Sequence, residues 1–455
     1  MIQAGEKAIV MGLGVSGRAA VRYLLARNMR VGVSEGRLER DLSDEERSFL
    51  GENSIHTEFG GHTVSFLTGG QFVVVSPGIA PDLKVLQQAR KAGVAVVGEL
   101  ALAAEEVDVP VVAVTGTNGK TTVTGLIGQL LASSGKEVFV GGNIGTPLLE
   151  YLTEPTGAEV LVLELSSFQL EMAGEFRANV ALLLNITPDH LDRHGTMEQY
   201  GAVKMRIFDH QQPGDTAIIS GDDPLCNRLA REETGKTFLR FGHGEGIQAH
   251  INGSTVTVTE DGGNEIYNLS DTDLAGGVGA LNAGAALLAV RALGCQKEEI
   301  EEGLKRFRLK PHRMEWVAEI DGVNYYNDSK ATNSGAVIGA LQQLEPPVIL
   351  IAGGRDKGDD YTLLLPQVEK KVSRLILLGE AREMIAQALE GATKIHQVDS
   401  MAEAVQLAYD KAVSGETVLL SPCCASFDLF DNYGHRGEVF RAWVRALEFE
   451  KRVGG

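Results

Sequence analysis

The segment VPVVAVTGTNGKTTVTGLIGQLLASSG, residues 109–135, constrains the fold more than any other part of the chain. A β-branched strand leads into a Gly-containing turn, and a helix follows whose N-terminal amides can face phosphate oxygens. The usual phosphate loop has another Gly five residues before Gly119, where this chain has Val114, so Gly116 is expected to serve the turn. The alternative is a chance turn with a solvated lysine. The pattern favours a nucleotide-binding loop made of Gly116, Thr117, Asn118, Gly119, Lys120, Thr121 and Thr122.

Length and charge limit the classes of protein to which the chain can belong. Its 455 residues exceed one compact core, which predicts about two to four domains. A formal net charge of −19 opposes broad contact with nucleic acid or with an anionic membrane surface. The N-terminus shows no signal peptide, no apolar run approaches the ~20 residues that span a bilayer, and the four cysteines lack CxxC spacing. We therefore expect a cytoplasmic protein with reduced thiols and no membrane insertion.

Hydrophobic periodicity and Gly punctuation divide the chain into three blocks of alternating strands and helices. We expect an α/β fold with three domains, at residues 1–98, 99–309 and 310–455. The first and third are expected to be Rossmann-like, and the central one to hold a P-loop ATPase-like parallel sheet. Residues 237–268 become polar and alternating, which predicts a small antiparallel addition to the central sheet.

A second Gly-rich loop, GLGVSG at residues 12–17, matches G-x-G-x-x-G between a strand and a helix. Glu35 ends the next strand, near the ~20-residue offset of a ribose-binding acid. The residues alone fit a dinucleotide or any nucleotide diphosphate on the helix N-terminus. A tight turn without a ligand is the alternative.

Polar residues after other strands are weaker signals. Glu164 ends VLVLE, where a carboxylate could hold Mg²⁺ near the loop, although a helix-capping or ion-pair role fits equally well. His190 follows another strand, in a position where a structural role is more common. Three polar clusters, at residues 325–336, 351–361 and 420–440, fit either site loops or solvated loops.

Eight motifs together resemble those of the Mur ligase family of cell-wall synthesis: TGTNGKTT, GGNIGTP, LELSSFQLE, TPDHLDRHG, PHRMEW, NDSKATN, GGRDKG and SPCCASFDLFDNYGHRG. With the GLGVSG loop they occur in the family's order from residue 12 to beyond residue 437. The last-named motif and NDSKATN are similar to those of the member that adds D-glutamate to UDP-N-acetylmuramoyl-L-alanine. The resemblance implies an ADP-forming ligase that works through an acyl phosphate in peptidoglycan synthesis, and hence in cell shape and division.

The resemblance also implies roles for individual residues. It implies ATP and two Mg²⁺ ions as cofactors, with Mn²⁺ as a substitute metal. Thr121 and Glu164 would bind one ion, and His190 would take part in the second site. Lys204 matches a family lysine that becomes carbamylated, since an ammonium cannot bind a cation and a carbamate can. The residues alone place Lys204 on the surface of a helix. The catalytic set is Lys120, Glu164, His190 and Lys204.

Three substrate sites follow from the same resemblance. The ATP site would add Asn143, Asn282, Arg313 and Asp328 to the phosphate loop. The UDP-sugar site would use Val15, Ser16, Ser34, Glu35, Ser76, Pro77, Gly78 and Asn143, so the first domain holds a UDP-linked substrate in place of a dinucleotide. The D-glutamate site would use Lys330, Thr332, Lys357, Ser426, Phe427 and Tyr433.

The sequence departs from the family pattern at two places. Val278-Gly279 replaces a pair, such as His-Asn, that many relatives carry near the adenine and ribose, and Ser34 stands where some relatives have an acid. Three alternatives stay open: a related ligase with another acceptor, a folylpolyglutamate-synthase-like ligase, and a non-catalytic nucleotide-binding module. For the leading interpretation we expect a monomer with small-molecule substrates only, whose domains close to assemble the site.

Overall fold

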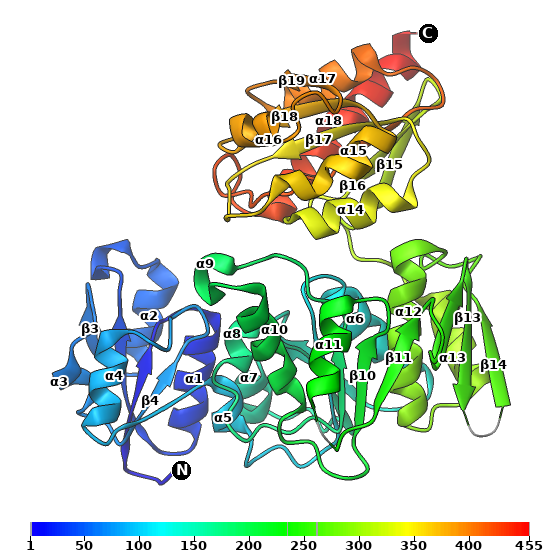
Figure 1. Ribbon diagram of the computed structural model, residues 1–455. Coiled ribbons are helices and arrows are strands. Elements are labelled where there is room, and N and C mark those ends of the chain that lie inside the picture. Colours follow the sequence, from blue (N-terminus) through cyan, green and yellow to red (C-terminus); the bar gives the residue numbers. More distant parts are fainter. Residues whose placement is uncertain (1, 234, 261–262, 455) are drawn as a thin grey trace.

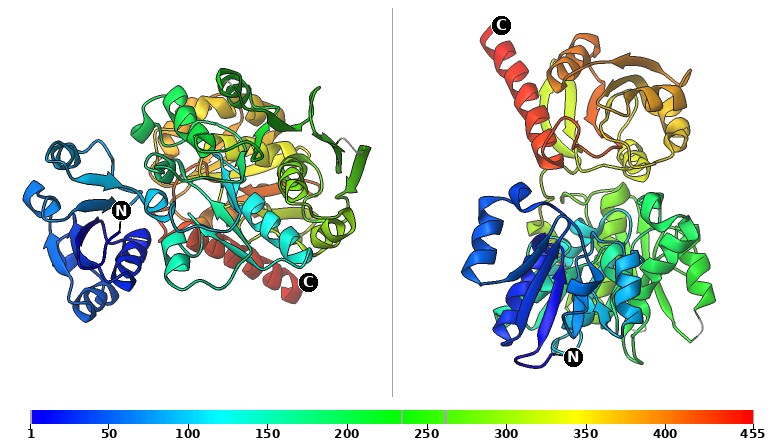
Figure 2. Two further views of the ribbon diagram at one scale, coloured as in Figure 1. Left: turned by 90° about the horizontal axis from the view of Figure 1, so that it is seen from below. Right: turned by 90° about the vertical axis from the view of Figure 1, so that its left-hand side faces the viewer.

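The computed structural model describes residues 2–233, 235–260 and 263–454, and it arranges them as three α/β domains (Figure 1). Within these ranges the N-terminal sheet has five strands, the central sheet has nine and the C-terminal sheet has six. The first two domains lie side by side, and the third lies over the central one, as two further views also show (Figure 2). The predicted three-domain α/β fold is confirmed; its exact boundaries stay predictions.

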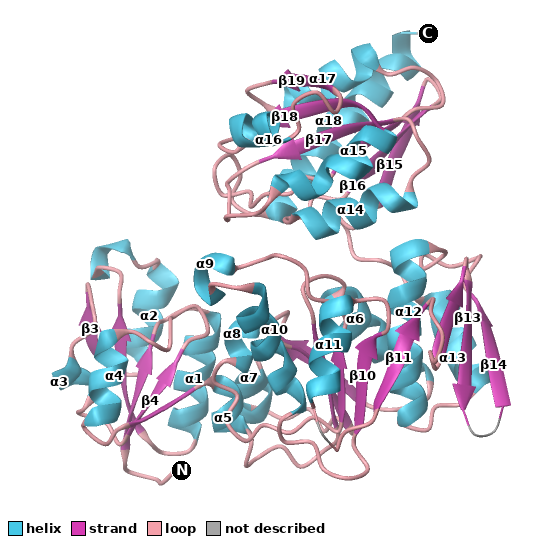
Figure 3. Cartoon of the chain, viewed as in Figure 1, coloured by secondary structure: helices cyan, strands magenta, loops and turns pink. Residues whose placement is uncertain are grey.

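The N-terminal sheet is parallel throughout and has the strand order β3-β2-β1-β4-β5. Its strands carry apolar runs such as FVVV because helices cover both faces (Figure 3). The strands are β1 (Lys7–Met11), β2 (Arg30–Glu35), β3 (His56–Phe59), β4 (Phe72–Val75) and β5 (Ala95–Val97). The helices are α1 (Val15–Ala26), α2 (Asp44–Glu52), α3 (Val64–Leu67) and α4 (Lys84–Lys91), with a 3₁₀ turn at Glu39–Asp41.

The central sheet is parallel around the phosphate loop and antiparallel at one edge, in the order β14-β13-β12-β11-β10-β9-β6-β8-β7. The antiparallel addition is thus confirmed, although residues 261–262 of the predicted segment lie outside the described residues. Its strands are β6 (Val111–Thr115), β7 (Val138–Gly142), β8 (Val160–Glu164), β9 (Val180–Leu183), β10 (Thr216–Ser220), β11 (Phe238–Gly242), β12 (Ala249–Asn252), β13 (Thr255–Glu260) and β14 (Gly263–Asn268).

Helices flank this sheet on both faces (Figure 3). The longest central helices, α6 and α12, are rich in small and apolar residues and pack against it. The helices are α5 (Glu99–Ala103), α6 (Lys120–Ser133), α7 (Leu148–Thr153), α8 (Ser167–Leu170), α9 (Leu191–His194), α10 (Met197–Met205), α11 (Pro224–Glu232), α12 (Gly277–Ala292) and α13 (Lys297–Arg306), with a 3₁₀ turn at Arg206–Phe208.

The C-terminal sheet has the order β15-β16-β20-β17-β18-β19 and is parallel except for the β15–β16 pair. The strands are β15 (Glu315–Ile320), β16 (Val323–Asn327), β17 (Val348–Gly353), β18 (Val372–Leu378), β19 (Lys394–Gln397) and β20 (Thr417–Leu420). The helices are α14 (Ser334–Gln343), α15 (Leu365–Lys371), α16 (Arg382–Ala388), α17 (Met401–Lys411) and α18 (Tyr433–Gly454), with a 3₁₀ turn at Tyr361–Leu364.

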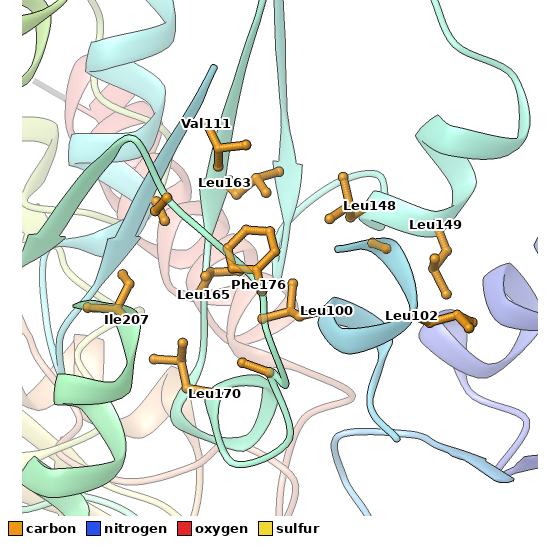
Figure 4. Close-up of a cluster of buried hydrophobic side chains, with 14 of the residues drawn as sticks. Leu100, Leu102, Val111, Leu148, Leu149, Leu163, Leu165, Leu170, Phe176 and Ile207 are labelled. Carbon is orange, nitrogen blue, oxygen red and sulfur yellow. The ribbon is translucent and has the colours of Figure 1, made fainter. Parts of the chain in front are cut away.

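The hydrophobic cores join the first two domains and leave the third separate. One buried cluster runs from β1 and α1 through Leu100 and Leu102 to Leu148 and Leu149 of α7 (Figure 4). The C-terminal domain packs two clusters of its own, whose buried members all follow residue 310. This division provides for motion of the third domain against the other two, because no shared apolar core would have to break.

Two further expectations concern the thiols and the membrane. All four cysteines are free and buried, in agreement with the expected reduced state. Among the described residues, no helix combines the length and apolar character that a bilayer crossing requires.

Arg436 ties the site loops of the C-terminal domain together. The side chain is 1% exposed, and its guanidinium donates to Ser329 Oγ at 3.0 Å, to Ser329 O at 2.9 Å and to Cys424 O at 3.0 Å. Burial lowers the pKa of Arg436 to about 10. The arginine therefore joins α18 to the loops after β16 and β20.

We expect Arg436→Met to lower the free energy of unfolding of the C-terminal domain by about 3 kcal/mol, because buried acceptors lose their charged donor. Urea unfolding followed by tryptophan fluorescence measures the loss. Arg445→Met, at an exposed position of the same helix, is the matched control and should cost less than about 0.5 kcal/mol. Equal losses for the two variants would contradict the assignment.

Candidate functional site

The phosphate loop leaves β6 and bends sharply into α6. Gly119 has φ +84° as the N-cap of α6, and a Cβ there would lie 2.6 Å from Asn282 Oδ1, so only glycine fits this position. Asn118 N donates to Asn185 Oδ1 at 2.8 Å, which fixes the middle of the loop to the residue two positions after β9. Lys120 Nζ folds back to Gly116 O at 2.8 Å and to Thr117 O at 2.7 Å. The loop therefore holds its own lysine over the position that phosphates occupy in such loops.

Lys204 lies behind this loop and is not on the surface. It is 1% exposed, and its Nζ donates to Gly116 O at 2.8 Å and lies 4.6 Å from the centre of the Tyr200 ring. The surface position expected from the residues alone is wrong, because α10 packs between the loop and α11. Burial, and then the charge of Lys120, lower the pKa of Lys204 well below its ordinary value. An amine in this place tends toward the neutral form, which is nucleophilic.

Glu164 ends β8 beside the loop. It is 2% exposed, and its Oε1 accepts a hydrogen bond from Asn143 Nδ2 at 2.8 Å. Its Oε2 is buried and has no hydrogen-bond partner among the described residues. A buried carboxylate oxygen without a donor lacks a cation or a proton, so this position fits a hard divalent ion.

His190 and Asp189 face the loop from the turn after β9. His190 has φ +54° and lies over Phe168, with 4.9 Å between ring centres. Asp189 Oδ1 accepts from Lys357 Nζ of the C-terminal domain at 2.7 Å. Burial opposes the charge of Asp189, but Lys357 and His190 outweigh it and hold the pKa of Asp189 below its usual value. The pair places opposite charges from two domains in direct contact.

A cavity of about 360 Å³, which we call the reaction cavity, lies where these groups meet. It brings together residues from all three predicted sets and from two domains. From the central domain they are Thr117, Asn118, Gly119, Lys120, Thr121, Asn143, Glu164 and His190; from the C-terminal domain they are Arg313, Lys330, Thr332, Lys357, Ser426, Phe427 and Tyr433. Gly116 and Lys204 lie behind its wall.

A second cavity of about 470 Å³, the nucleotide cavity, opens on the other side of the loop. Asn118, Gly119 and Arg313 line both cavities, so the two are adjacent. Burial raises the pKa of Asp328 to about 7, although Met314 N and Ser421 Oγ donate to it. The predicted members of its lining are Asn118, Gly119, Thr122, Asn282, Arg313 and Asp328, and Val278 and Gly279 also line it.

A third cavity of about 690 Å³, the N-terminal cavity, lies at the carboxyl ends of β1, β2 and β4. Asn143 lines both this cavity and the reaction cavity. Of the predicted UDP-sugar set, the structure brings Val15, Ser16, Glu35, Ser76, Pro77, Gly78 and Asn143 to its wall. Ser34 is buried beneath the wall and bonds Glu58 and His62.

The sequence interpretation missed several residues that complete these cavities. Asp189 was within a quoted motif, and its place beside His190 was the available signal. Asn333 Oδ1 accepts from Asn118 Nδ2 at 3.2 Å across the domain boundary. Arg37 and His62 line the N-terminal cavity, and no motif pointed to them. Contacts made by isolated polar residues across domains leave no local pattern in a sequence.

Family models match the chain in three segments. The Mur ligase MurD-like N-terminal domain matches residues 6–98, the Mur ligase middle domain matches residues 114–290, and the Mur ligase glutamate ligase domain matches residues 312–424.

Relatives match nearly the whole chain. A UDP-N-acetylmuramoylalanine–D-glutamate ligase of Desulfotalea psychrophila is 51% identical over 440 residues, which cover 96% of each chain. The protein of the same description from Syntrophus aciditrophicus is 41% identical, over 97% of this chain and 98% of its own.

Solved structures share the fold at low identity. A pseudomurein peptide ligase type C from Methanothermus fervidus has a TM-score of 0.62 at 19% identity, over 98% of this chain and 100% of its own. A MurF ligase from Thermotoga maritima in complex with ADP has a TM-score of 0.60 at 19% identity, over 99% and 98%. FolC of E. coli with DHPP and ADP has a TM-score of 0.58 at 22% identity, but it covers only 76% of this chain and 92% of its own.

We expect Asp189→Asn to weaken the contact between the central and C-terminal domains by about 1–2 kcal/mol, because the ion pair with Lys357 loses its charge. Small-angle scattering of the ligand-free protein should show a larger radius of gyration. Asp192→Asn, at an exposed position of the adjacent helix α9, keeps the pair and is the control. An unchanged radius for Asp189→Asn would show that the pair does not hold the domains together.

Proposed function

This chain belongs to the Mur ligase family, and we propose that it joins D-glutamate to UDP-N-acetylmuramoyl-L-alanine at the expense of ATP, in peptidoglycan synthesis. The full-length relatives at 41–51% identity share this activity by their names. One observation carries the residue assignment: the reaction cavity places the phosphate loop opposite the lysines of the C-terminal domain. An ATP-dependent ligase needs that arrangement, because the phosphorylated carboxylate must meet an incoming amine.

The chemistry explains the residues around the loop. A carboxylate is a poor electrophile, so the γ-phosphoryl of ATP is first transferred to an oxygen of the L-alanine carboxylate, and ADP leaves. The amine of D-glutamate then attacks the carbonyl carbon, loses a proton, and displaces phosphate through a tetrahedral intermediate. Both steps concentrate negative charge, which Lys120 and Arg313 on the cavity wall would stabilise.

The amino-acid substrate brings two carboxylates and therefore needs cations. Lys330 and Lys357 line the C-terminal side of the reaction cavity, with Thr332, Ser426, Phe427 and Tyr433 around them. Lys330 Nζ lies 3.9 Å from the centre of the Tyr433 ring. Burial, and then Arg313, lower the pKa of Lys330 to about 8, so an arriving carboxylate would strengthen its charge. We assign the D-glutamate carboxylates to these two lysines.

Glu164, Thr121 and His190 fit divalent ions. The Oε2 of Glu164 has no hydrogen-bond partner among the described residues, so it is the strongest candidate for a metal ligand. Thr121 and Glu164 line the same cavity. Two Mg²⁺ ions, for which Mn²⁺ could substitute, would neutralise the phosphates and polarise the substrate carboxylate when bound. Among the described residues, no group of three acidic, His or Cys side chains is arranged to hold a metal ion by itself, so substrate oxygens would complete both sites.

Lys204 fits the carbamylated lysine of the family. Its amine is buried and its pKa is strongly lowered, which favours the neutral nucleophile. The lone pair of Nζ would attack the carbon of CO₂, and loss of one proton would leave a carbamate with two anionic oxygens. Such a group would place a negative charge beside Gly116 where the neutral amine stood, and so could contribute to the second metal site with His190.

The remaining cavities fit the remaining substrates. ATP would place its adenosine in the nucleotide cavity, near Asn282 and Asp328, and the UDP of the sugar substrate would occupy the N-terminal cavity. Residues of one chain line all three cavities, which is consistent with a monomer. Because the reaction would consume ATP, we propose that it takes place in the cytoplasm.

The N-terminal domain separates this function from the folylpolyglutamate alternative. The chain matches the MurD-like N-terminal domain over residues 6–98, whereas FolC covers 76% of the chain. An assay of phosphate release distinguishes the proposed ligase from a related ligase with another acceptor and from a module without catalysis.

We expect phosphate release from ATP to require both UDP-N-acetylmuramoyl-L-alanine and D-glutamate, because the acyl phosphate forms only on the first and is consumed only by the second. A coupled phosphate assay with a panel of D-glutamate, L-alanine, a diamino acid and D-alanyl-D-alanine tests this. Preference for any amine other than D-glutamate would assign another acceptor. Equal hydrolysis of ATP without either substrate would sink the ligase proposal.

We expect Lys204→Arg to lower turnover by at least about 100-fold, because a guanidinium cannot form the carbamate. Nuclear magnetic resonance after equilibration with ¹³C-bicarbonate should show a carbamate carbon in the unaltered protein and lose it in the variant. Lys297→Arg, at a half-exposed position that begins α13, is the control for both measurements. Full activity of Lys204→Arg would refute the role.

A further inference from the structure

A fourth cavity lies beside α6, and the proposed function assigns no substrate to it. Its volume is about 310 Å³. One wall is α6, and the other is the end of α13 with the connection at residues 307–314, by which the chain passes from the central to the C-terminal domain (Figure 1). We call it the hinge cavity, because it lies where these two domains are joined.

The side chains of α6 leave room for this cavity. Thr121, Gly125 and Gln129 line it at a spacing of four residues, which places them on one face of the helix. A Cβ at Gly125 would lie 3.9 Å from Phe307 Cε2, at ordinary contact distance. Glycine at this position therefore keeps open the space between the helix and the connection.

The hinge cavity adjoins the place where phosphate would be transferred. Thr121 and Arg313 line both it and the reaction cavity, and Thr122 and Arg313 line both it and the nucleotide cavity. In the proposed reaction, ADP fills the nucleotide cavity, and the peptide product spans the reaction and N-terminal cavities. The hinge cavity is thus a neighbouring space that neither of these products fills.

The wall of the hinge cavity is cationic. Arg306, Arg308, Lys310 and Arg313 line it, and no carboxylate of the described residues does, although the chain carries a formal net charge of −19. Arg306 forms an ion pair with Glu302 on α13. The other three cations have no such partner. A concentration of positive charge in an acidic protein attracts small anions to this place.

The three unpaired cations have free donors. The guanidinium of Arg308 donates to main-chain oxygens, at 2.8 and 2.7 Å, and to no carboxylate in the described ranges. Neither Lys310 nor Arg313 makes a hydrogen bond or an ion pair within the described part of the chain. Arg313 is half-buried, and burial lowers its pKa although nearby carboxylates oppose the shift. A guanidinium in this position is stabilised by an anion that accepts its hydrogen bonds.

We propose that the hinge cavity binds the orthophosphate displaced from the acyl phosphate and is the route by which this product leaves the site. The anion would pass from Arg313, which lines both cavities, to Arg308 and Lys310, which are exposed to solvent. A tetrahedral oxyanion accepts hydrogen bonds on several sides, which suits donors from two walls. The inference rests on the proposed function in that the phosphate comes from the ligase reaction.

Titration of the full chain with inorganic phosphate tests the site without turnover. The measurement is ³¹P nuclear magnetic resonance at constant ionic strength, with ADP and Mg²⁺ present. Arg308→Gln/Lys310→Gln should weaken phosphate binding by at least about tenfold, because two charged donors are lost. Lys297→Gln/Lys305→Gln removes the same charge from α13 outside the cavity and should weaken it by less than about threefold. Equal losses in the two double variants would overturn the proposal, since net charge alone would explain them.

Gly125 allows a test that leaves the charge unchanged. Gly125→Leu should fill the space beside Phe307 and weaken phosphate binding by at least about tenfold, whereas Gly125→Ala fits that space and is the matched control. Both variants should keep their affinity for ADP, because Gly125 does not line the nucleotide cavity. Undiminished phosphate binding by Gly125→Leu would place the anion elsewhere and overturn the proposal.

Lys120→Ala separates the hinge cavity from the phosphate loop. Because Lys120 lines the reaction cavity and not the hinge cavity, this variant should keep phosphate binding that depends on Arg308 and Lys310. Loss of phosphate binding in Lys120→Ala, with no loss in Arg308→Gln/Lys310→Gln, would assign the anion to the loop and overturn the proposal.

A single turnover tests the route. Chemical quenching measures the peptide product, and a fluorescent phosphate-binding protein measures free phosphate. The lag of free phosphate behind the product should be at least about threefold longer in Gly125→Leu than in Gly125→Ala. Equal lags would overturn the exit route. Phosphate binding that depends on the hinge cavity, in a protein without ligase turnover, would reject the proposed function and support the site itself.

Discussion

The site depends on two amines, one half-buried and one buried, that share one carbonyl oxygen. Lys120 and Lys204 both donate to Gly116 O at 2.8 Å, and neither has a carboxylate within hydrogen-bond distance among the described residues. Burial lowers the pKa of both amines, because no carboxylate of the described residues stabilises their charged forms by a direct hydrogen bond. Glu164 has the opposite problem, since one of its buried oxygens lacks a donor. The phosphates and cations of the proposed reaction would resolve both imbalances, and the residues around the loop fit that requirement.

Local pattern was enough to predict the architecture. Runs such as VVAVT and VLVLE are buried on both faces, and parallel strands of that kind need helices on each side. The alternation in TVTVTE likewise predicted the antiparallel edge, where one face is exposed. The pattern did not predict that the hydrophobic cores of the first two domains join through Leu148 and Leu149. Helix contacts across domains depend on how the helices are placed and not on periodicity.

The geometry around the phosphate loop could be predicted from local sequence, whereas positions that depend on burial could not. The loop around Gly119 was predictable because a strand, a positive-φ glycine and a helix follow one another in the chain. Lys204 was not, since α10 has apolar residues all round and gives no sign of which side is buried. Ser34 was expected at the wall and lies beneath it, and His62, which takes the place at the wall, follows the short and weakly apolar strand HTEF.

The boundary between the central and C-terminal domains has an evolutionary consequence. Most of the proposed phosphate chemistry belongs to residues before the boundary, with Arg313 as an exception, and the proposed amine recognition belongs to residues after it. Direct polar contacts across it include Asn118 with Asn333 and Asp189 with Lys357. If recombination replaced the C-terminal domain, little more than these contacts would have to be preserved for the carboxylate-activating residues to keep working. Descent with exchange of the final module could therefore diversify the joined amino acid while the machinery that activates the carboxylate stayed the same.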